Sequence, residues 1–289
     1  MWTDMLICRS ITDIRAAVAG FRGRGGSVGL VTTMGALHAG HVSLVERAGA
    51  EHAHTVATIF VNPTQFGNAS DLATYPRTEE ADLALLRAAG VSAVFIPDVS
   101  EIYTDGDETI VETTRLANML HGLVRPGHFR GVATVVCKLF NIIGADAAYF
   151  GEKDYQQLQV IRRMVRDLHM PITIHGVPTV READGLAMSS RNVRLTPADR
   201  AAAVCLNLAL ARAEALAAKG ADIEALRAVI HDTITAEPRA RLRAIDIVEA
   251  LTLAPVSGVP TGDIGIMISA EFGPDDNAVL LIDQREIRK

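Results

Sequence analysis

The first 177 residues alternate short β-rich runs with segments of helical periodicity, and this alternation limits the fold more than any other feature. Apolar residues recur at helical spacing around Val42–Ala48 and over Thr78–Ala89, Val132–Ile143 and Asp154–Leu168. The runs that predict strands are Val28–Thr33, Thr55–Val61, Ala93–Ile96, Ala147–Phe150 and Ile172–Val177. Such alternation favours a doubly wound parallel sheet with helices on both faces. Ligands of such sheets bind at the carboxyl ends of the strands.

The pattern changes after Pro178, which indicates a second domain. Thr196 followed by Pro197 is typical of a helix start, and Gly220 is typical of a helix stop. The expected elements are helices over Pro197–Lys219 and Asp222–Ala236 and strands over Ala244–Leu251, Ile264–Glu271 and Ala278–Ile282. We therefore predict an α/β domain of residues 1–177 and a smaller α/β domain of residues 178–289.

Composition excludes several classes of protein. The 289 residues include 28 Lys and Arg against 34 Asp and Glu, and only 4% are aromatic, which argues against nucleic-acid and anionic-membrane partners. Cys8, Cys137 and Cys205 lie far apart, without metal-ligand spacing, so neither a metal site nor a disulfide framework is expected. A reducing cytoplasm is the simplest compartment. The N-terminal residues resemble no signal peptide, and Gly131–Phe150 is too polar and too short to span a bilayer.

The sharpest local feature is the segment TMGALHAGH, Thr33–His41, which follows a predicted strand and opens a helix. His38 and His41 would lie at the helix N-terminus, where free N–H groups and a partial positive charge suit phosphate. Gly40 would let a ligand approach the backbone closely. The alternative is that both histidines only cap the helix, but the strand–turn–helix context favours a phosphate site.

The segment GEKDYQQ, Gly151–Gln157, also follows a strand and opens a helix. The chain has four lysines against 24 arginines, so Lys153 departs from the usual choice of cation in this chain. A compact ammonium that reaches a phosphate is one explanation. An exposed cluster of charges at a helix start is the other.

A third segment, Met188–Asn192, contains Ser189, Ser190 and Arg191. Two hydroxyls and a guanidinium in a flexible loop can bind a polyphosphate. The same residues are also common in a polar turn, and taken alone the segment favours that interpretation.

Two further segments carry polar residues among apolar ones. In Phe60–Phe66, Gln65 can orient a small ligand by hydrogen bonds, or it can be a turn residue whose hydrogen bonds are made within the protein. In Gly127–Gly131, His128 and Arg130 can face the same crevice or cap the apolar helix that follows.

Together these segments closely resemble the pantoate–β-alanine ligase (pantothenate synthetase) family, which belongs to the nucleotidylyltransferases with a His-x-Gly-His signature. The signature alone is moderately specific, whereas six segments in the same order are highly specific. Thr32 stands where the family commonly has Pro, which we expect to shift the loop before Met34 slightly and to weaken nucleotide binding without abolishing activity. The matching segments are TMGALHAGH, FVNPTQF, DLATYPRT, GHFRGVATVVCKLF, GEKDYQQL and READGLAMSSRN.

The resemblance implies a Rossmann-like first domain, a C-terminal domain that acts as a lid, and a homodimer. It implies that pantoate attacks the α-phosphate of ATP to give pantoyl adenylate, and that β-alanine then displaces AMP to give pantothenate. Mg²⁺ is expected to travel with ATP, because no dedicated protein cage is visible in the sequence. The resemblance assigns phosphate binding and catalysis to His38, His41, Lys153, Ser189, Ser190 and Arg191. It assigns the nucleotide to Met34, Gly40, Gly151, Asp154, Val180 and Met188, and pantoate to Asn62, Gln65 and Gln157.

Two alternatives stay open, one a related enzyme and the other a protein without catalysis. A nucleotidylyltransferase acting on another small substrate is disfavoured by the glutamine pair and the GEKDYQQL segment. A nucleotide or pantoate sensor without catalysis is disfavoured because both histidines, Lys153 and the Ser-Ser-Arg loop are present. A class I aminoacyl-tRNA synthetase shares the style of signature, but the sequence has no basic tRNA-binding extension.

Overall fold

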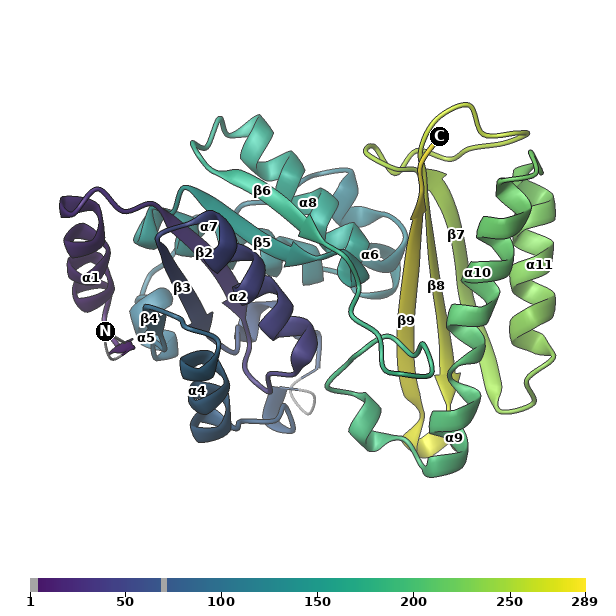
Figure 1. Ribbon diagram of the computed structural model, residues 1–289, viewed down its shortest axis with the longest axis horizontal. Helices are drawn as coiled ribbons and strands as arrows, with labels where there is room; N and C mark the ends of the chain where they lie inside the picture. Colours follow the sequence, from purple (N-terminus) through teal and green to yellow (C-terminus); the bar gives the residue numbers. More distant parts are fainter. Residues whose placement is uncertain (1–4, 69–71) are drawn as a thin grey trace. The chain divides into compact units, whose positions relative to one another are not determined.

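The computed structural model describes residues 5–68 and 72–289 (Figure 1). Asp71, the first residue of the DLATYPRT segment, therefore lies outside the described residues. The chain divides into two units, of which the first comprises Met1–Gly151 and Gln156–Val177 and the second Glu152–Tyr155 and Pro178–Lys289. Within the described ranges, no helix is both long enough and apolar enough to cross a membrane.

The described part of the first unit is built on a six-stranded sheet in the order β1-β4-β3-β2-β5-β6. All five strand pairings are parallel, which confirms the predicted doubly wound sheet. The strands are β1 (Leu6–Cys8), β2 (Val28–Thr33), β3 (His54–Ile59), β4 (Ala93–Phe95), β5 (Ala147–Gly151) and β6 (Thr173–Val177). The described helices of four or more residues are α1 (Ile11–Gly23), α2 (Ala39–Glu51), α4 (Glu79–Ala88), α5 (Val99–Ile102), α6 (His121–Val124), α7 (His128–Ile143) and α8 (Tyr155–Asp167).

Helices cover both faces of this sheet because later strands are added first on one side of β2 and then on its other side. The chain moves from β2 to β3 and β4 through α2 and α4, and it moves from β4 to β5 and β6 through α7 and α8. Right-handed crossovers in opposite directions lie on opposite faces. Leu44 and Val45 of α2 and Leu86 of α4 accordingly share one core cluster with Val31 and Tyr149 of the sheet. Figure 1 shows α2 and α4 on the near side of the sheet.

The winding direction changes between β2 and β5, which lie side by side with Val31 opposite Tyr149. In open parallel sheets the ligand crevice forms at such a switch point, beyond the carboxyl ends of the strands. The TMGALHAGH segment continues from β2, and Gly151 ends β5. The two segments that follow these strands therefore begin on either side of the switch point.

The second unit contains a three-stranded antiparallel sheet, in the order β7-β8-β9, among its described residues. Alternate residues of β8, among them Ile266, Ile268 and Phe272, pack with Leu210 of α10 and Ile230 of α11 in one core. This period of two is that of a strand with one face against helices. The elements are α9 (Pro197–Ala202), α10 (Cys205–Ala217), α11 (Ile223–Thr235), β7 (Ala240–Glu249), β8 (Ile264–Phe272) and β9 (Val279–Ile287). Short 3₁₀ turns, from both units, are η1 (Pro63–Gln65), η2 (Leu116–Asn118), η3 (Glu152–Asp154), η4 (Asn192–Arg194) and η5 (Asp275–Asn277).

Three expectations from the sequence were wrong in detail. The sequence predicted no element before Val28–Thr33, whereas β1 and α1 precede it. The expected helix Pro197–Lys219 is interrupted between α9 and α10, where the N–H of Leu206 donates to the carbonyl of Ala203, three residues back. Such a bond is that of a 3₁₀ turn, so the interruption is a local tightening. Strand β9 also continues beyond the expected end at Ile282.

Candidate active site

Helix α2 begins with two hydrogen bonds that involve both histidines of the signature. His38 is the N-cap, and its Nδ1 accepts the N–H of Gly40 at 3.1 Å. The N–H of His38 donates in turn to Nδ1 of His41 at 3.3 Å. A ring nitrogen that accepts a hydrogen bond carries no proton, so the neutral form of each ring has its N–H at Nε2. Capping and phosphate binding are therefore compatible, because Nδ1 of each ring accepts a backbone N–H and the proton of the neutral ring lies on Nε2.

The two imidazole rings lie close together at the positive end of the α2 dipole. Their centroids are 4.2 Å apart, and both side chains are half-buried. Since α2 follows β2, both rings belong to the carboxyl end of the sheet. Two N–H donors next to a helix N-terminus form an arrangement suited to an anion.

Asn62, shortly after the end of β3, is buried, with only 1% of its surface exposed, and its side chain makes several hydrogen bonds. Its Nδ2 donates to Oε1 of Gln65 at 3.0 Å and to the carbonyl of Gly131 at 3.2 Å. Its Oδ1 accepts the hydroxyls of Tyr103 at 2.8 Å and Thr64 at 2.9 Å. These contacts show that Asn62 orients Gln65, while direct contact with a substrate stays a prediction.

The contact from Asn62 decides which way the amide of Gln65 points. With Oε1 as the acceptor from Asn62, Nε2 is the donor, and it lies 3.1 Å from Sδ of Met34. A thioether is a weak acceptor, so a carboxylate or hydroxyl oxygen is a better partner for this N–H. The structure thus brings together Met34 and Gln65, two residues that the sequence assigned to different substrates.

The first residue of α7, His128, also contacts Gln65. Nδ1 of His128 lies 2.9 Å from the carbonyl of Gln65, and Nε2 lies 3.3 Å from the guanidinium of Arg125. Because the guanidinium only donates, Nδ1 carries the proton and donates to Gln65. Arg130 is exposed. Of the two residues that the sequence left undecided, His128 therefore contacts the candidate site and positions its backbone.

The paired glutamines of α8 have different surroundings. Gln157 is half-buried in the first unit. Gln156 is buried, and its Nε2 donates to the carbonyls of Leu116 and Met119 at 2.9 and 2.8 Å. Its Oε1 accepts the N–H of His121 at 3.1 Å. Gln156 thus fixes the loop before α6, a structural role that the sequence did not reveal, and the assignment of Gln157 to pantoate stays a prediction.

Lys153 and Asp154 lie in η3, which belongs to the second unit although it directly follows β5. Nζ of Lys153 lies 4.0 Å from Oδ2 of Asp154, and the lysine side chain is 20% exposed. The next residue, Tyr155, anchors the turn, since its hydroxyl lies 2.7 Å from Oε2 of Glu286. A Cβ at Gly265 would lie 2.7 Å from the Tyr155 ring, so a glycine is needed there. Lys153 is thus held on a firmly packed segment.

Residues 180–188 form a hairpin that brings together two residues assigned to the nucleotide. The N–H of Met188 donates to the carbonyl of Val180 at 3.0 Å, and the N–H of Glu182 donates to that of Leu186 at 2.8 Å. The hairpin leads into the Ser-Ser-Arg loop. The N–H of Arg191 donates to Oγ of Ser189 at 3.2 Å, which makes the loop a local turn, and its guanidinium is exposed.

An ionic network holds this loop. Nδ2 of Asn192 donates to Oε1 of Glu182 at 2.9 Å and to the carbonyl of Ala187 at 3.1 Å. Arg200 donates to Glu182 at 2.6 Å and to Asp184 at 2.7 Å. The hydrogen bonds from Arg200 lower the pKa of both carboxyl groups, so they stay ionised at neutral pH. Sequence reasoning did not assign these four side chains, because their partners are 10 to 18 residues away.

The predicted residues fall into two groups, one in each unit. The departure at Thr32 lies within β2, opposite Thr58 of β3, and its effect on nucleotide binding stays a prediction. The first unit contains Met34, His38, Gly40, His41, Asn62, Gln65, Gly151 and Gln157. The second contains Lys153, Asp154, Val180, Met188, Ser189, Ser190 and Arg191.

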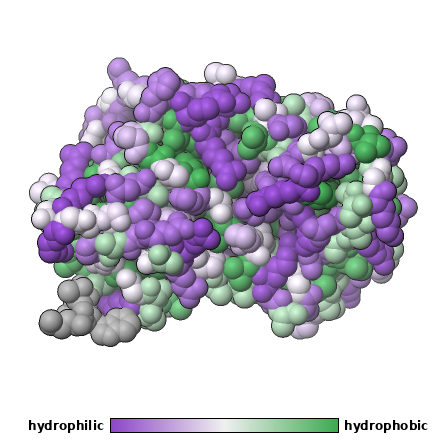
Figure 2. Space-filling view, turned by 45° about the horizontal axis from the view of Figure 1, so that its top comes forward, coloured by the Kyte–Doolittle hydropathy of each residue, from purple (hydrophilic) through white to green (hydrophobic). Residues whose placement is uncertain are grey.

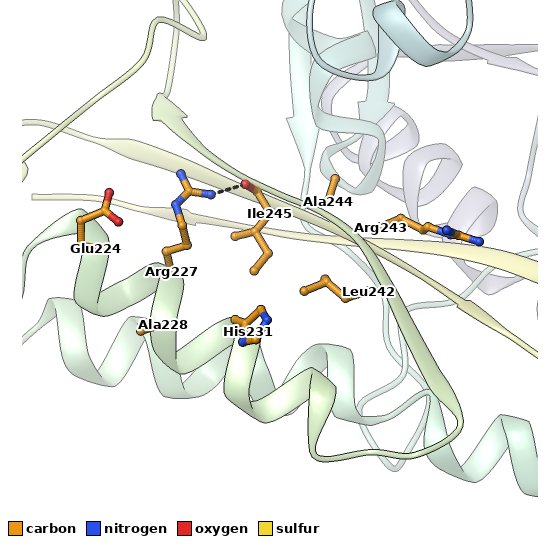
Figure 3. Close-up of a pocket in the computed structure, with 8 residues that line it drawn as sticks. All are labelled: Glu224, Arg227, Ala228, His231, Leu242, Arg243, Ala244 and Ile245. Atoms are coloured by element: carbon orange, nitrogen blue, oxygen red, sulfur yellow. Dashed lines mark hydrogen bonds between the residues drawn. The ribbon is translucent and has the colours of Figure 1, made fainter.

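A depression in the second unit does not coincide with these residues (Figure 3). It lies between α11 and the edge strand β7, where Nη1 of Arg227 donates to the carbonyl of Ile245 at 2.6 Å. On the face drawn in Figure 2, hydrophobic residues lie in small groups between hydrophilic ones, which is ordinary for a protein surface. The depression is lined by Glu224, Arg227, Ala228, His231, Leu242, Arg243, Ala244 and Ile245.

Comparison with known proteins assigns the chain to a family. The family model described as Pantoate-beta-alanine ligase matches residues 6–286. The pantothenate synthetase of Agrobacterium fabrum is 49% identical over 284 residues, 98% of this chain and 96% of that protein. The pantothenate synthetase of Rhizobium meliloti is 50% identical over 279 residues, 96% of this chain and 94% of that protein.

Two solved structures of pantothenate synthetases match nearly the full length of the chain. The pantothenate synthetase of Thermus thermophilus matches with a TM-score of 0.91 at 44% identity, over 99% of this chain and 100% of that one. The pantoate-beta-alanine ligase of Francisella tularensis, solved with beta-gamma ATP and beta-alanine, matches with a TM-score of 0.77 at 34% identity, over 97% of both chains. This chain therefore belongs to the pantoate–β-alanine ligase family.

Proposed function

We propose that this chain condenses pantoate with β-alanine in an ATP-dependent reaction that passes through pantoyl adenylate. The observation that carries the proposal is the start of α2, where both imidazole rings use Nδ1 for the backbone and keep the N–H at Nε2. An adenylate-forming enzyme needs such donors, because negative charge develops on the phosphoryl oxygens during the transfer.

In the first half-reaction, a carboxylate oxygen of pantoate attacks the α-phosphorus of ATP. The bond from that phosphorus to the bridging oxygen breaks, and pyrophosphate leaves. His38 and His41 donate N–H groups to the phosphoryl oxygens, and Lys153 places an ammonium on them. Ser189, Ser190 and Arg191 bind the phosphates, while positioning supplies most of the remaining rate enhancement.

Pantoate carries a carboxylate and hydroxyl groups, and a primary amide can donate to the first and either donate to or accept from the second. Gln65 and Gln157 suit this substrate because they bind it without adding charge. Asn62 contributes by fixing the amide of Gln65. Nucleotide contacts are assigned to Met34, Gly40, Gly151, Asp154, Val180 and Met188.

In the second half-reaction, the neutral β-alanine amine attacks the acyl carbon of pantoyl adenylate, AMP leaves with the bonding electron pair, and the nitrogen releases one proton as the amide forms. Acyl adenylates react with water, so we assign residues 178–289 the role of a lid that excludes it. No group of three or more His, Cys, Asp and Glu side chains within residues 5–68 and 72–289 is placed to hold a metal ion. We therefore propose that Mg²⁺ arrives on the ATP phosphates, where it offsets their charge. We also propose that the chain forms a homodimer and acts in the cytoplasm.

The test is to measure pyrophosphate and AMP with ATP, Mg²⁺ and pantoate, with and without β-alanine. The proposal expects pyrophosphate release that requires pantoate and sustained AMP release only with β-alanine. A nucleotidylyltransferase would instead accumulate a nucleotide adduct with another acid. Tight ATP binding without turnover would indicate a sensor and contradict the proposal.

Replacing Gly131 by alanine is expected to raise the KM for pantoate about tenfold or more, with a smaller change in the KM for ATP. A Cβ at Gly131 would lie 2.5 Å from the carbonyl oxygen of Thr64 and 2.8 Å from Cα of Gln65, so η1 would have to move. Steady-state kinetics at varied pantoate measures the effect. Gly20→Ala, in α1, is the matched control, because the nearest atom to its Cβ would be 3.9 Å away. Pantoate kinetics that match this control in a folded variant would remove the positioning role of Gly131.

A further inference from the structure

Asp82 of α4 is a buried carboxylate, 2% exposed, that binds the loop between β2 and α2. Its Oδ2 accepts the N–H of Ala36 at 3.0 Å, and its Oδ1 accepts the N–H of Leu37 at 2.8 Å. The hydroxyl of Thr78 lies 3.2 Å from both oxygens. A carboxylate offers about four acceptor positions, so one side chain can hold consecutive N–H groups and a hydroxyl together.

The loop that Asp82 binds has an unfavourable backbone. Gly35 has φ +83° and Ala36 has φ +50°, so two consecutive residues are left-handed. Glycine tolerates this region, but alanine rarely adopts it. A Cβ at Gly35 would also lie 3.0 Å from Oδ2 of Asp82, so glycine is needed for the close approach as well. Such a conformation persists only where neighbouring groups impose it, and the two bonds to Asp82 do so.

The left-handed pair turns the chain from β2 into α2. It lies two residues before His38, whose extended backbone (φ −142°) caps the helix and whose N–H binds Nδ1 of His41. A different backbone at Ala36 would move the N-cap and with it both rings. The orientation of the two Nε2–H groups thus depends on a carboxylate 41 residues further along the chain than His41.

We infer that Asp82 is a positioning residue for adenylate formation, which acts by holding Gly35–Leu37 so that His38 and His41 keep their orientation. The inference rests on the proposed function. The carboxylate acts through the backbone of the loop and through the two histidines.

The Asp82→Asn variant tests the inference. The amide keeps one acceptor oxygen, but its NH₂ group faces the second backbone N–H, and two donors cannot bond. Pantoate-dependent pyrophosphate release is expected to fall about tenfold to a hundredfold, as for a small misplacement of catalytic groups. The attack of β-alanine on supplied pantoyl adenylate is expected to change little. Thr78→Val is the matched control, because it removes only the hydroxyl contact.

A double-mutant cycle separates positioning from a general loss of structure. In the His41→Asn background, Asp82→Asn is expected to lower the rate by a smaller factor than in the wild-type background, because one of the two imidazoles that it positions is already absent. An equal factor in both backgrounds would contradict the inference. If Asp82→Asn fails to fold, Asp82→Asn with Ala36→Gly is measured in its place, because glycine relieves the left-handed backbone.

Imidazole ¹⁵N spectra give a readout without turnover. Asp82→Asn is expected to change the Nδ1 and Nε2 signals of His38 and His41, whereas Thr78→Val leaves them as in the wild type. Unchanged spectra together with an unchanged rate would overturn the inference. If the wild-type chain releases no pyrophosphate with pantoate, the proposed function fails, while the spectra still decide whether Asp82 holds the histidines.

Discussion

The His41→Ala variant is expected to form pantoyl adenylate about a hundredfold to a thousandfold more slowly than the wild-type chain. Removing one preorganised donor to a developing oxyanion typically has an effect of this size. The group concerned is the Nε2–H of His41, because its Nδ1 is occupied by the N–H of His38. Single-turnover release of pyrophosphate from ATP and pantoate measures the step directly.

Two further substitutions separate the roles of the ring nitrogens. His41→Asn keeps an acceptor near the position of Nδ1, so the start of α2 is expected to stay intact while activity is lost. His41→Gln places an amide N–H near the position of Nε2, so it is expected to retain more activity than His41→Asn. Losing a helix cap typically costs about 0.5–2 kcal/mol of stability, so thermal unfolding separates the two effects.

His231→Ala is the matched control for these variants. His231 lies on α11 with an exposed side chain that pairs with Asp232, so its removal is expected to leave the rate unchanged. If His41→Ala and His231→Ala release pyrophosphate at the same rate, His41 has no part in the chemistry. If His41→Asn loses stability but not activity, the ring serves only the helix.

The sequence predicted the central sheet well because its strands are buried on both faces. Val28–Thr33 coincides with β2, and the other central strands lie within two residues of their expected bounds at either end. Strand β1 was not predicted, because it has only three residues and lies at the edge of the sheet, with Leu6 and Ile7 each more than 40% exposed. Burial patterns are weak at such an edge, so periodicity alone could not find it.

The candidate site was predictable where it follows strands, and not where it depends on distant partners. His38 and His41 stand in a recognisable strand–turn–helix context. Asp82 gives no such indication. It lies 46 residues from Ala36 along the chain, and an acidic residue in a helix with apolar residues is normally expected on the exposed face of that helix. Gly131 likewise resembles an ordinary small helical residue, although its missing side chain admits the backbone of Thr64. Both functions come from tertiary contacts, which local sequence does not encode.

Replacing Lys153 by methionine is expected to slow adenylate formation about a hundredfold to a thousandfold. Methionine keeps an unbranched stem of similar length but removes the ammonium that the proposal places on the ATP phosphates. The Lys153 side chain is only 20% exposed and lies on a turn anchored by Tyr155, so its charge is held in place. A fixed cation costs little reorganisation as charge develops, which is why its loss affects the rate strongly.

Two variants complete the test of Lys153. Lys153→Arg keeps the charge but replaces a compact ammonium by a broad planar group, so its rate is expected to lie between those of Lys153→Met and the wild-type chain. Lys219→Met, just beyond α10 and exposed, is the matched control and is expected to behave as the wild type. Single-turnover pyrophosphate release is compared for all three. If Lys153→Met is as fast as Lys219→Met, the charge of Lys153 does not act on the phosphates. If Lys153→Arg is no faster than Lys153→Met, the shape of the ammonium matters as much as its charge.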